Sequence, residues 1–450
     1  MSKSILVCVL AILLSWPAVS IVQAQALKGV FTTTTIPLKT TFNLEPHAGN
    51  PAFWSGARQL IGDIDGNGVI DLLFLKQSGD GKAFLVYSPN APTQRYNQTF
   101  DLANVGGSVA GAVFAGLSGQ GEAPFGFAGS PAGDFNGDGI DDFVLGMLGI
   151  DDNGADAGHG YVIYGKSGAA RLSGSYSLVN VGTSGLPGVR FVGFEFDAFA
   201  GNDFSPAGDM NGDGVNDLWL GSFAANHPDR QSGQDDSGFF YLIYGKTGMA
   251  AWTGTHVLPD GTCGTGGIVT FVGAAEGDAA GCSLSGRVDV DGDGKNDLLV
   301  GADARWGIGA GQAYLIYGDG QNHSGKVFDL IDYTDRCAAM APAVLDAARF
   351  DAIGTVDDAG RSVAIVGDAN GDQNDTPDLL IGAWKANPKG FPLPGGEAYL
   401  IYGQGGMNRY EGDKDLATWA LRFHPPSQVF DSKVRPRGTR LASVSGLQEM

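Results

Sequence analysis

Residues 134–142 read Asp-Phe-Asn-Gly-Asp-Gly-Ile-Asp-Asp, and this nine-residue loop recurs along the chain. Four copies have the form D-x-[DN]-G-[DN]-G-x-x-D, and a fifth copy is altered. Consecutive copies start 71 to 80 residues apart. A period this regular indicates that one supersecondary unit is repeated, so the fold must be worked out from the unit. The five copies begin at Asp63, Asp134, Asp209, Asp289 and Asp368.

Two apolar runs follow the loop in each copy. In the fourth copy, residues 298–302 come directly after the loop, and residues 313–318 follow after a variable connection. Short runs of β-branched and aromatic residues, bounded by Gly, Asp and Asn, are typical of strands. Their apolar character is nearly continuous, which indicates that both faces are buried, as in small sheets that stack on one another.

Four strands in each repeat predict the radial blades of a β-propeller. We expect an all-β fold: a β-propeller of four-stranded antiparallel blades, with five complete blades and a partial sixth. The nine-residue loops would then lie in the hairpins between the first and second strands. The complete repeats are expected around residues 55–105, 126–182, 200–260, 280–333 and 360–420, and the partial repeat at 436–450.

Three features of the unit carry a resemblance to a known family. A glycine-rich stretch precedes the loop, the next strand ends in Val-Gly-Ala (300–302) or Ile-Gly-Ala (381–383), and Tyr-Leu-Ile-Tyr-Gly follows, as at 314–318. This order resembles the FG-GAP repeat of the integrin α-chain N-terminal β-propeller, over nearly the whole chain after residue 55. The chain departs from that family in two ways: no copy contains Phe-Gly and Gly-Ala-Pro in full, and integrin propellers have seven blades.

The sequence leaves two possibilities for how the propeller ring is completed. Residues 438–444 resemble the first strand of a sixth unit, as at 360–364. Either this strand joins N-terminal residues such as 30–44 to help close a ring, or the sequence is a truncated version of a longer propeller. An unpaired blade edge would be an aggregation hazard.

The composition of the loop predicts calcium. Calcium takes about six to eight oxygen ligands in flexible geometry, and the loop offers side-chain oxygens at positions 1, 3, 5 and 9 and a carbonyl at position 7. Glycines at positions 4 and 6 permit the turns that aim these groups at one point. The predicted ligands are Asp63, Asp65, Asn67, Val69 and Asp71; Asp134, Asn136, Asp138, Ile140 and Asp142; Asp209, Asn211, Asp213, Val215 and Asp217; Asp289, Asp291, Asp293, Lys295 and Asp297; and Asp368, Asn370, Asp372 and Asp378.

The fifth loop departs from the pattern. Gln373 replaces the second glycine, Thr376 stands at position 9, and Asp378 comes two residues later. We expect Asp378 to close a fifth Ca2+ site around a longer loop. In all five loops every ligand comes from the protein and no base is evident nearby, so the sites are expected to be structural rather than catalytic.

Two other interpretations fit the loop less well. An EF-hand needs Glu at position 12 and a helix on each side, but position 12 here is an apolar residue inside a predicted strand. Solvated Asp-Gly hairpin turns would account for one copy. They do not account for four full matches in register.

The N-terminus has the pattern of a targeting segment. Lys3 gives a basic start, residues 5–22 are mostly apolar, and small residues stand at Ala24 and Ala26. We expect a signal peptide at 1–24, with residue 26 as an alternative cleavage point, and the propeller at 25–450. The mature chain is then expected to be secreted or extracytoplasmic, in the periplasm or on the cell surface, with no membrane-spanning segment.

The net charge limits the classes of partner, and the cysteines offer one candidate disulfide. The net charge of −21 argues against nucleic acid and acidic membrane surfaces. After signal cleavage three cysteines remain. Cys263 and Cys282 are candidates for a disulfide in an oxidising compartment, which leaves Cys337 as a buried or partly buried thiol.

The loops between the second and third strands are expected on the face opposite the calcium loops. The longest are 222–239 and 384–397, and variable loops on a rigid scaffold usually carry binding. The resemblance implies that this face binds ligands in integrins. We therefore expect a binding or cell-adhesion module with a protein or glycan ligand, and not an enzyme. The alternatives are an extracellular propeller-type hydrolase, phospholipase-like, and a structural surface protein without a specific ligand.

Overall fold

The computed structural model describes a chain built almost entirely of strands. It covers residues 41–43, 58–76, 81–89, 99–116, 127–227, 229, 235–305, 309–338, 343–354, 356–371, 376–387, 395–404 and 409–423. The expected signal peptide (1–24), the partial repeat (436–450) and the predicted ligand Asp372 lie outside these residues. The helices within them are η1 (Leu102–Asn104), η2 (Gly168–Ala170), η3 (Leu178–Asn180), η4 (Gly248–Ala250) and α2 (Leu416–Trp419). No described helix is long and apolar enough to cross a membrane.

The strands form five sheets of four to six strands and one two-stranded pair. Sheet one contains β2 (Arg58–Leu60), β3 (Leu72–Lys76), β4 (Lys82–Val86), β6 (Gly111–Ala115) and β10 (Gly174–Ser177). Sheet two contains β7 (Phe127–Gly133), β8 (Asp142–Met147), β9 (His159–Ile163), β11 (Gly188–Val192) and β15 (Gly254–Val257). Sheet three contains β12 (Phe204–Gly208), β13 (Asp217–Ser222), β14 (Phe239–Ile243), β16 (Ile268–Val272), β20 (Val327–Asp329) and β21 (Thr334–Asp335).

The remaining sheets continue the series. Sheet four contains β17 (Ala280–Val288), β18 (Asp297–Ala302), β19 (Gln312–Ile316), β22 (Ala347–Asp351) and β26 (Gly412–Asp415). Sheet five contains β23 (Ala359–Val366), β24 (Asp378–Ala383), β25 (Glu397–Ile401) and β27 (Leu421–Phe423), and the pair consists of β1 (Thr41–Asn43) and β5 (Thr99–Asp101).

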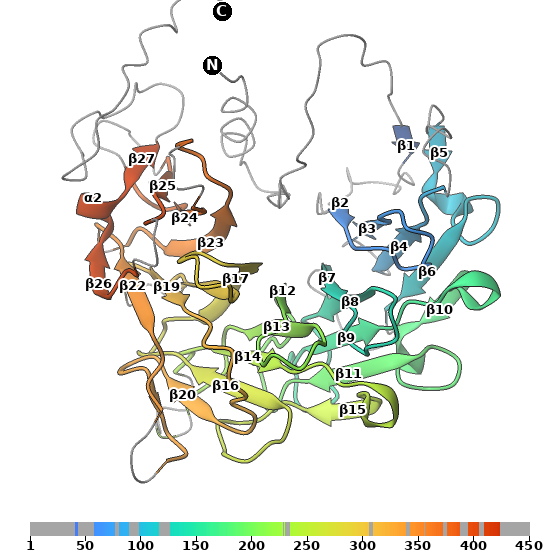
Figure 1. The fold of residues 1–450 in the computed structure, drawn as a ribbon, viewed down its shortest axis with the longest axis horizontal. Coiled ribbons are helices and arrows are strands. Elements are labelled where there is room, and N and C mark those ends of the chain that lie inside the picture. The colour runs from blue at the N-terminus through green and yellow to red at the C-terminus, as the bar shows by residue number, and fades with distance from the viewer. Residues whose placement is uncertain are drawn as a thin grey trace, which may run out of the picture.

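The five sheets follow one another around an arc, as blades do in a propeller (Figure 1). The first strand of each sheet lies on the inside of the arc, where β7, β12, β17 and β23 contact one another in sequence. Sheets one and five stand at the two ends of the arc in the described part of the chain (Figure 1). The expected all-β, propeller-like architecture is confirmed at this level.

Sheets one to four each also receive a strand from the following repeat, and the expected four-stranded antiparallel blade did not include this pairing. Four consecutive strands of a repeat pair antiparallel, but between its third and fourth strands the chain crosses to the outer edge of the preceding sheet and pairs there in parallel. We call these the crossing strands. They are β10 on β6, β15 on β11, β20 on β16 and β26 on β22, and β5 pairs with β1 in the same way.

The core lies between adjacent sheets. Along β8, Phe143 and Leu145 pack against sheet one, while Val144 between them packs toward sheet three, and all three are fully buried. This alternation follows from the period of two along a strand. It repeats at each sheet-to-sheet boundary, so the expectation that both faces are buried is confirmed for the inner sheets.

Glycine immediately before the loop lets the sheets approach closely. Gly133 and Gly208 have φ of 67° and 72°, in the left-handed region. A Cβ at Gly133 would stand 2.8 Å from the Asn216 side chain, and one at Gly208 would stand 2.3 Å from Asn296. Each of these asparagines belongs to the loop of the next sheet, so adjacent loops interlock through a position that only glycine fits.

The candidate disulfide between Cys263 and Cys282 does not form. Cys263 is bonded to Cys337, with their Cα atoms 5.7 Å apart, and Cys282 is free. The reason is the crossing strand: β20 and β21 of one repeat pair at the outer edge of sheet three, which brings Cys337 beside the segment that precedes β16. Cys282 lies on β17, at the inner edge of sheet four, and its Sγ donates to the carbonyl of Gly360 at 3.4 Å.

The stacked-sheet core predicts a large difference between two leucines. Leu145→Ala removes a side chain that is fully buried between sheets one and two, and we expect it to lower the free energy of unfolding by about 2–5 kcal/mol. Leu60→Ala is the matched control, because Leu60 is 48% exposed and should lose less than about 0.5 kcal/mol. Denaturant unfolding at fixed calcium concentration measures both. Equal losses would contradict this core.

Candidate metal centres

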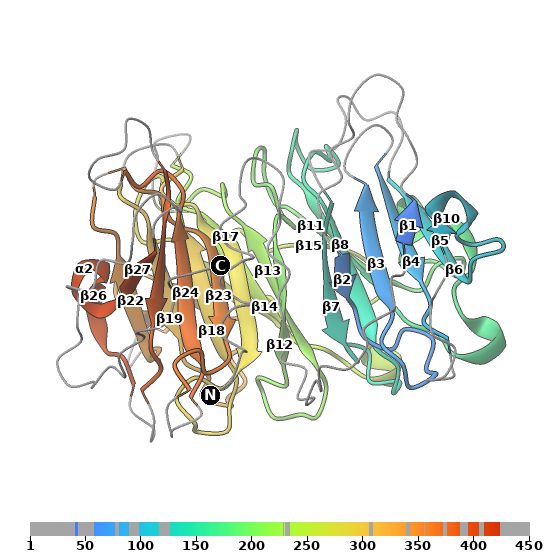
Figure 2. The same cartoon turned by 90° about the horizontal axis from the view of Figure 1, so that it is seen from above.

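The five loops occupy equivalent places in the fold. Each leads from the first to the second strand of its sheet: from β2 to β3, β7 to β8, β12 to β13, β17 to β18 and β23 to β24. Because successive strands are antiparallel, these loops lie on one side of the arc, and the loops between second and third strands lie on the other (Figure 2).

In each loop, backbone amides of the loop donate hydrogen bonds to the carboxylate of the first-position aspartate. In the second loop, Asp134 Oδ1 accepts the amide of Asp138 at 2.9 Å and Oδ2 accepts the amide of Gly139 at 2.8 Å. The same residue accepts the amides of positions 5 and 6 in loop one, those of positions 4 to 6 in loops three and four, and the amide of Gly371 in the fifth. The amides therefore fix the carboxylate while the loop turns around it.

The ninth-position aspartate joins the loop to the sheet. In the fourth loop, Asp297 Oδ2 accepts the amide of Val290 at 2.7 Å, and Oδ1 accepts the amide of Gly318, beyond the third strand, at 2.9 Å. Asp378 makes the equivalent bonds to Ala369 at 2.8 Å and Gly403 at 2.7 Å. It thus occupies the ninth place although it comes two residues late in the sequence.

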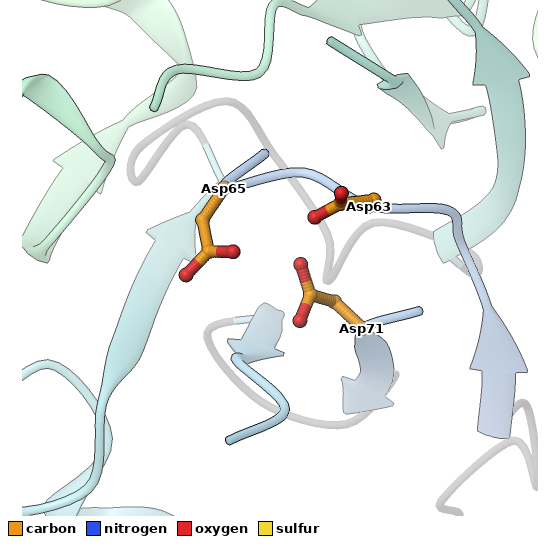
Figure 3. A group of neighbouring side chains, drawn as sticks. All are labelled: Asp63, Asp65 and Asp71. Atoms are coloured by element: carbon orange, nitrogen blue, oxygen red, sulfur yellow. The ribbon is translucent and has the colours of Figure 1, made fainter. Parts of the chain in front are cut away.

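In two loops three carboxylates converge. Asp63, Asp65 and Asp71 each offer an oxygen, and these oxygens lie within 4.8 Å of one another. Figure 3 shows the three carboxylates turned toward a common space. The fourth loop has an equivalent group, which consists of Asp289, Asp291 and Asp297.

The first loop fits a hard divalent cation. Its donors are oxygens, which calcium prefers. Asp65 is 5% exposed, and its buried Oδ1 has no hydrogen-bond partner. A buried carboxylate oxygen without a donor is costly unless a cation or a proton satisfies it. Asp63, Asp65 and Asp71 would hold the ion here, and in the fourth loop Asp289, Asp291 and Asp297 would do so.

Loops two and three differ at the third position, which is asparagine. Asn136 Nδ2 lies 3.5 Å from Asp142 Oδ1, and Asn211 Nδ2 donates to Asp213 Oδ2 at 3.1 Å. Among the described residues, no group of three His, Cys, Asp or Glu side chains converges in these two loops. One further bond is shared by all four regular loops: the side chain of the fifth position accepts the backbone amide of the seventh position. The donors are the amides of Val69, Ile140, Val215 and Lys295.

Burial raises the pKa of the ninth-position carboxyls. It raises the pKa of Asp71, Asp217 and Asp297 to about 7 and that of Asp378 to about 6. The pKa of Asp142 is also raised well above its ordinary value by burial. The neighbouring loop carboxylates act in the same direction. A bound divalent cation would reverse this balance by favouring the charged form.

Two arginines at these loops were not anticipated from the sequence. Arg171 Nη1 lies 3.2 Å from Asp65 Oδ2, and Arg409 contacts Asp291 and Asp293. Both belong to the segment that crosses over from the next repeat. A signal was present, because each stands six residues after the glycine that ends the Tyr-x-x-Tyr-Gly run. It could not be interpreted without knowing that this segment crosses to the preceding sheet.

Comparison with known proteins gives distant similarity to integrin α chains. No protein-family model matches the chain. The chain is 27% identical to integrin alpha pat-2 of Caenorhabditis elegans over 253 residues, which is 55% of this chain and 18% of that protein. It is 27% identical to integrin alpha-PS2 of Drosophila melanogaster over 181 residues, 40% of this chain and 11% of that protein. The chain therefore resembles integrin α chains, and it spans less than a fifth of the length of the relatives it matches.

The raised carboxyl pKa values predict how pH acts on the calcium-free protein. A carboxyl whose pKa rises from about 4 in the unfolded chain to about 7 in the fold binds an extra proton in the folded state between those values. Stability in chelator should therefore fall as pH rises from about 4 through about 7.

The stabilisation by calcium should instead increase as pH rises, because protons compete with the cation for the same oxygens. We expect the calcium-induced rise in Tm to be larger at pH 8 than at pH 5.5. Thermal unfolding with calcium and with chelator at the two pH values tests this. A calcium effect that grows on acidification would contradict it.

Proposed function

We propose that the chain is an extracytoplasmic, calcium-stabilised, integrin-α-like β-propeller that acts as a binding or cell-adhesion module. The observation that carries the proposal is the repeated loop, with a fully buried carboxylate at the ninth place of each copy. The integrin α relatives support it. A hydrolase and a ligand-free structural protein remain the less favoured candidates, because no feature of the described residues favours either.

The proposed cation is Ca2+, bound at four regular loops and at the altered fifth, and its role is structural. The ligands would be the predicted residues at positions 1, 3, 5, 7 and 9. The all-oxygen donor set and the buried, unpartnered oxygen of Asp65 support this. At a free calcium concentration ten times the Kd, each site would stabilise the fold by about 1.4 kcal/mol.

We further propose that the five sheets are the complete blades of the propeller and that a sixth is partial. The pairing of β1 with β5 supports this, because β5 holds the place of a crossing strand and β1 then holds the place of a fourth strand in a further blade. Residues 436–450 would supply the first strand of the same blade.

The proposed ligand, a protein or a glycan, would bind on the side opposite the cation loops. Trp384 begins the loop between β24 and β25, its side chain is 57% exposed, and the Lys385 ammonium lies 5.1 Å from its ring. Lys385 is held by Asp358 at 2.8 Å. Tryptophan is among the residue types that are enriched at the hot spots of binding surfaces.

The calcium proposal predicts the stoichiometry of the folded protein. Native mass spectrometry should find four to five calcium ions per chain, and Asp297→Asn should remove one. Asp260→Asn is the control, because Asp260 lies outside the loops and should leave the number unchanged. A chain that binds no calcium at millimolar concentrations would contradict the proposed function.

The binding proposal predicts a distinction between two exposed tryptophans. The full chain, with calcium, is screened on glycan and extracellular-protein arrays. Trp384→Ala should weaken the strongest interaction by at least about tenfold, as for a hot-spot residue. Trp419→Ala should not, because Trp419 is also exposed (39%) but lies on α2, away from this loop. Equal loss in the two variants, or the absence of any interaction in calcium, would count against a binding surface at Trp384.

A further inference from the structure

Arg171 joins the first cation loop to the neighbouring repeat. It directly follows η2, in the segment that crosses from β9 to the outer edge of sheet one. Its Nη1 lies 3.2 Å from Asp65 Oδ2, and its guanidinium lies 5.2 Å from the ring centre of Tyr87. Tyr87 in turn donates its hydroxyl to the carbonyl of Leu172 at 2.9 Å. The loop, the third strand of sheet one and the crossing segment therefore meet at one arginine.

Arg409 repeats this arrangement at the fourth loop. It contacts Asp291, donates from Nη2 to Asp293 Oδ2 at 3.0 Å, and lies 4.9 Å from the ring centre of Tyr317. The amide of Tyr410 donates to the Tyr317 hydroxyl at 2.8 Å. Two repeats far apart in the sequence thus place an arginine against the third-position aspartate, although Asp291 Oδ1 also accepts the amide of Asp293 at 3.0 Å.

The remaining regular loops lack both partners. The third position of loop two is Asn136, and Ala251 stands where the arginine would be. The backbone is the same, because Ala251 has φ −51° and ψ 142° and Arg171 has φ −54° and ψ 147°. In loop three, Asn211 likewise accompanies Ser324, six residues after Gly318. Aspartate at the third position occurs with arginine, and asparagine occurs without it.

We propose that Arg171 and Arg409 are positioning residues that bind the outer oxygen of the third-position aspartate and turn its inner oxygen toward the cation. This inference rests on the proposed calcium binding. It is supported at Asp65, where Oδ2 is held by the arginine and the buried Oδ1 has no hydrogen-bond partner. Groups that hydrogen-bond to a metal-binding carboxylate orient it and tune the affinity of the site.

The arginines also link loops one and four to the crossing segment of the next repeat, a link that loops two and three lack. Each arginine belongs to the crossing segment, so a cation that fixes the third-position aspartate also fixes the edge of the next repeat. Calcium in loop one should stabilise η2 and β10, and calcium in loop four should stabilise residues 409–415. Calcium in loop two should have little effect on η4 and β15, because the described side-chain contacts of Asn136 all lie within its own loop.

Hydrogen exchange of the full chain, with and without calcium, tests this coupling. We expect calcium to slow exchange in residues 168–177 and 409–415, and Arg171→Met to reduce the slowing in 168–177 by about threefold to tenfold, as for one partly exposed charged hydrogen bond. Arg171→Lys should restore part of it. The segment 409–415 serves as an internal control in both variants, since Arg409 is intact.

The complementary variant introduces the arginine–aspartate pair at loop two. Asn136→Asp with Ala251→Arg should create calcium-dependent slowing in residues 248–257, whereas Ala251→Arg alone should not. Native mass spectrometry of the same samples counts the bound calcium. No calcium in the wild type would overturn the proposed function itself. Normal calcium binding with slowing that is indifferent to Arg171, or no gain in the double variant, would overturn the positioning role alone.

Discussion

The buried carboxylate at the ninth position of each loop is the contact on which the rest of the structure depends. It begins the second strand, accepts an amide from the loop, and accepts another amide from beyond the third strand, as Asp297 does. One side chain therefore fixes the hairpin, the sheet and the floor of the candidate cation site together. Its burial raises its pKa, and this unfavourable charge is what a bound cation would relieve.

The sequence was sufficient for what lies within one repeat. The apolar runs after each loop correspond to the second and third strands, and their continuous character correctly predicted stacked sheets with both faces buried. The altered fifth loop was also interpretable, because Asp378 is the acidic residue that directly precedes the apolar run 379–382. A carboxylate at that junction occupies the ninth place whatever the length of the loop before it.

What passes between repeats could not be predicted. The crossing strand β10 reads Gly-Ser-Tyr-Ser and is half-buried or exposed, so it has no apolar period that would mark it as a strand. Its partner strand belongs to the preceding sheet. A repeat pattern shows which strands a unit contains, but not which of them pairs with a neighbouring unit. The wrong disulfide and the two overlooked arginines have this one cause, because Cys337, Arg171 and Arg409 all lie in crossing segments.

The crossing strands also impose an order on biosynthesis. The outer edge of sheet one is β6, which ends at Ala115, but the strand that covers it begins only at Gly174, in the next repeat. A nascent chain that has folded its first four strands therefore still presents an open edge until the ribosome has released most of the following repeat. Open edges recruit other strands, so each repeat covers the exposed edge of the repeat made before it.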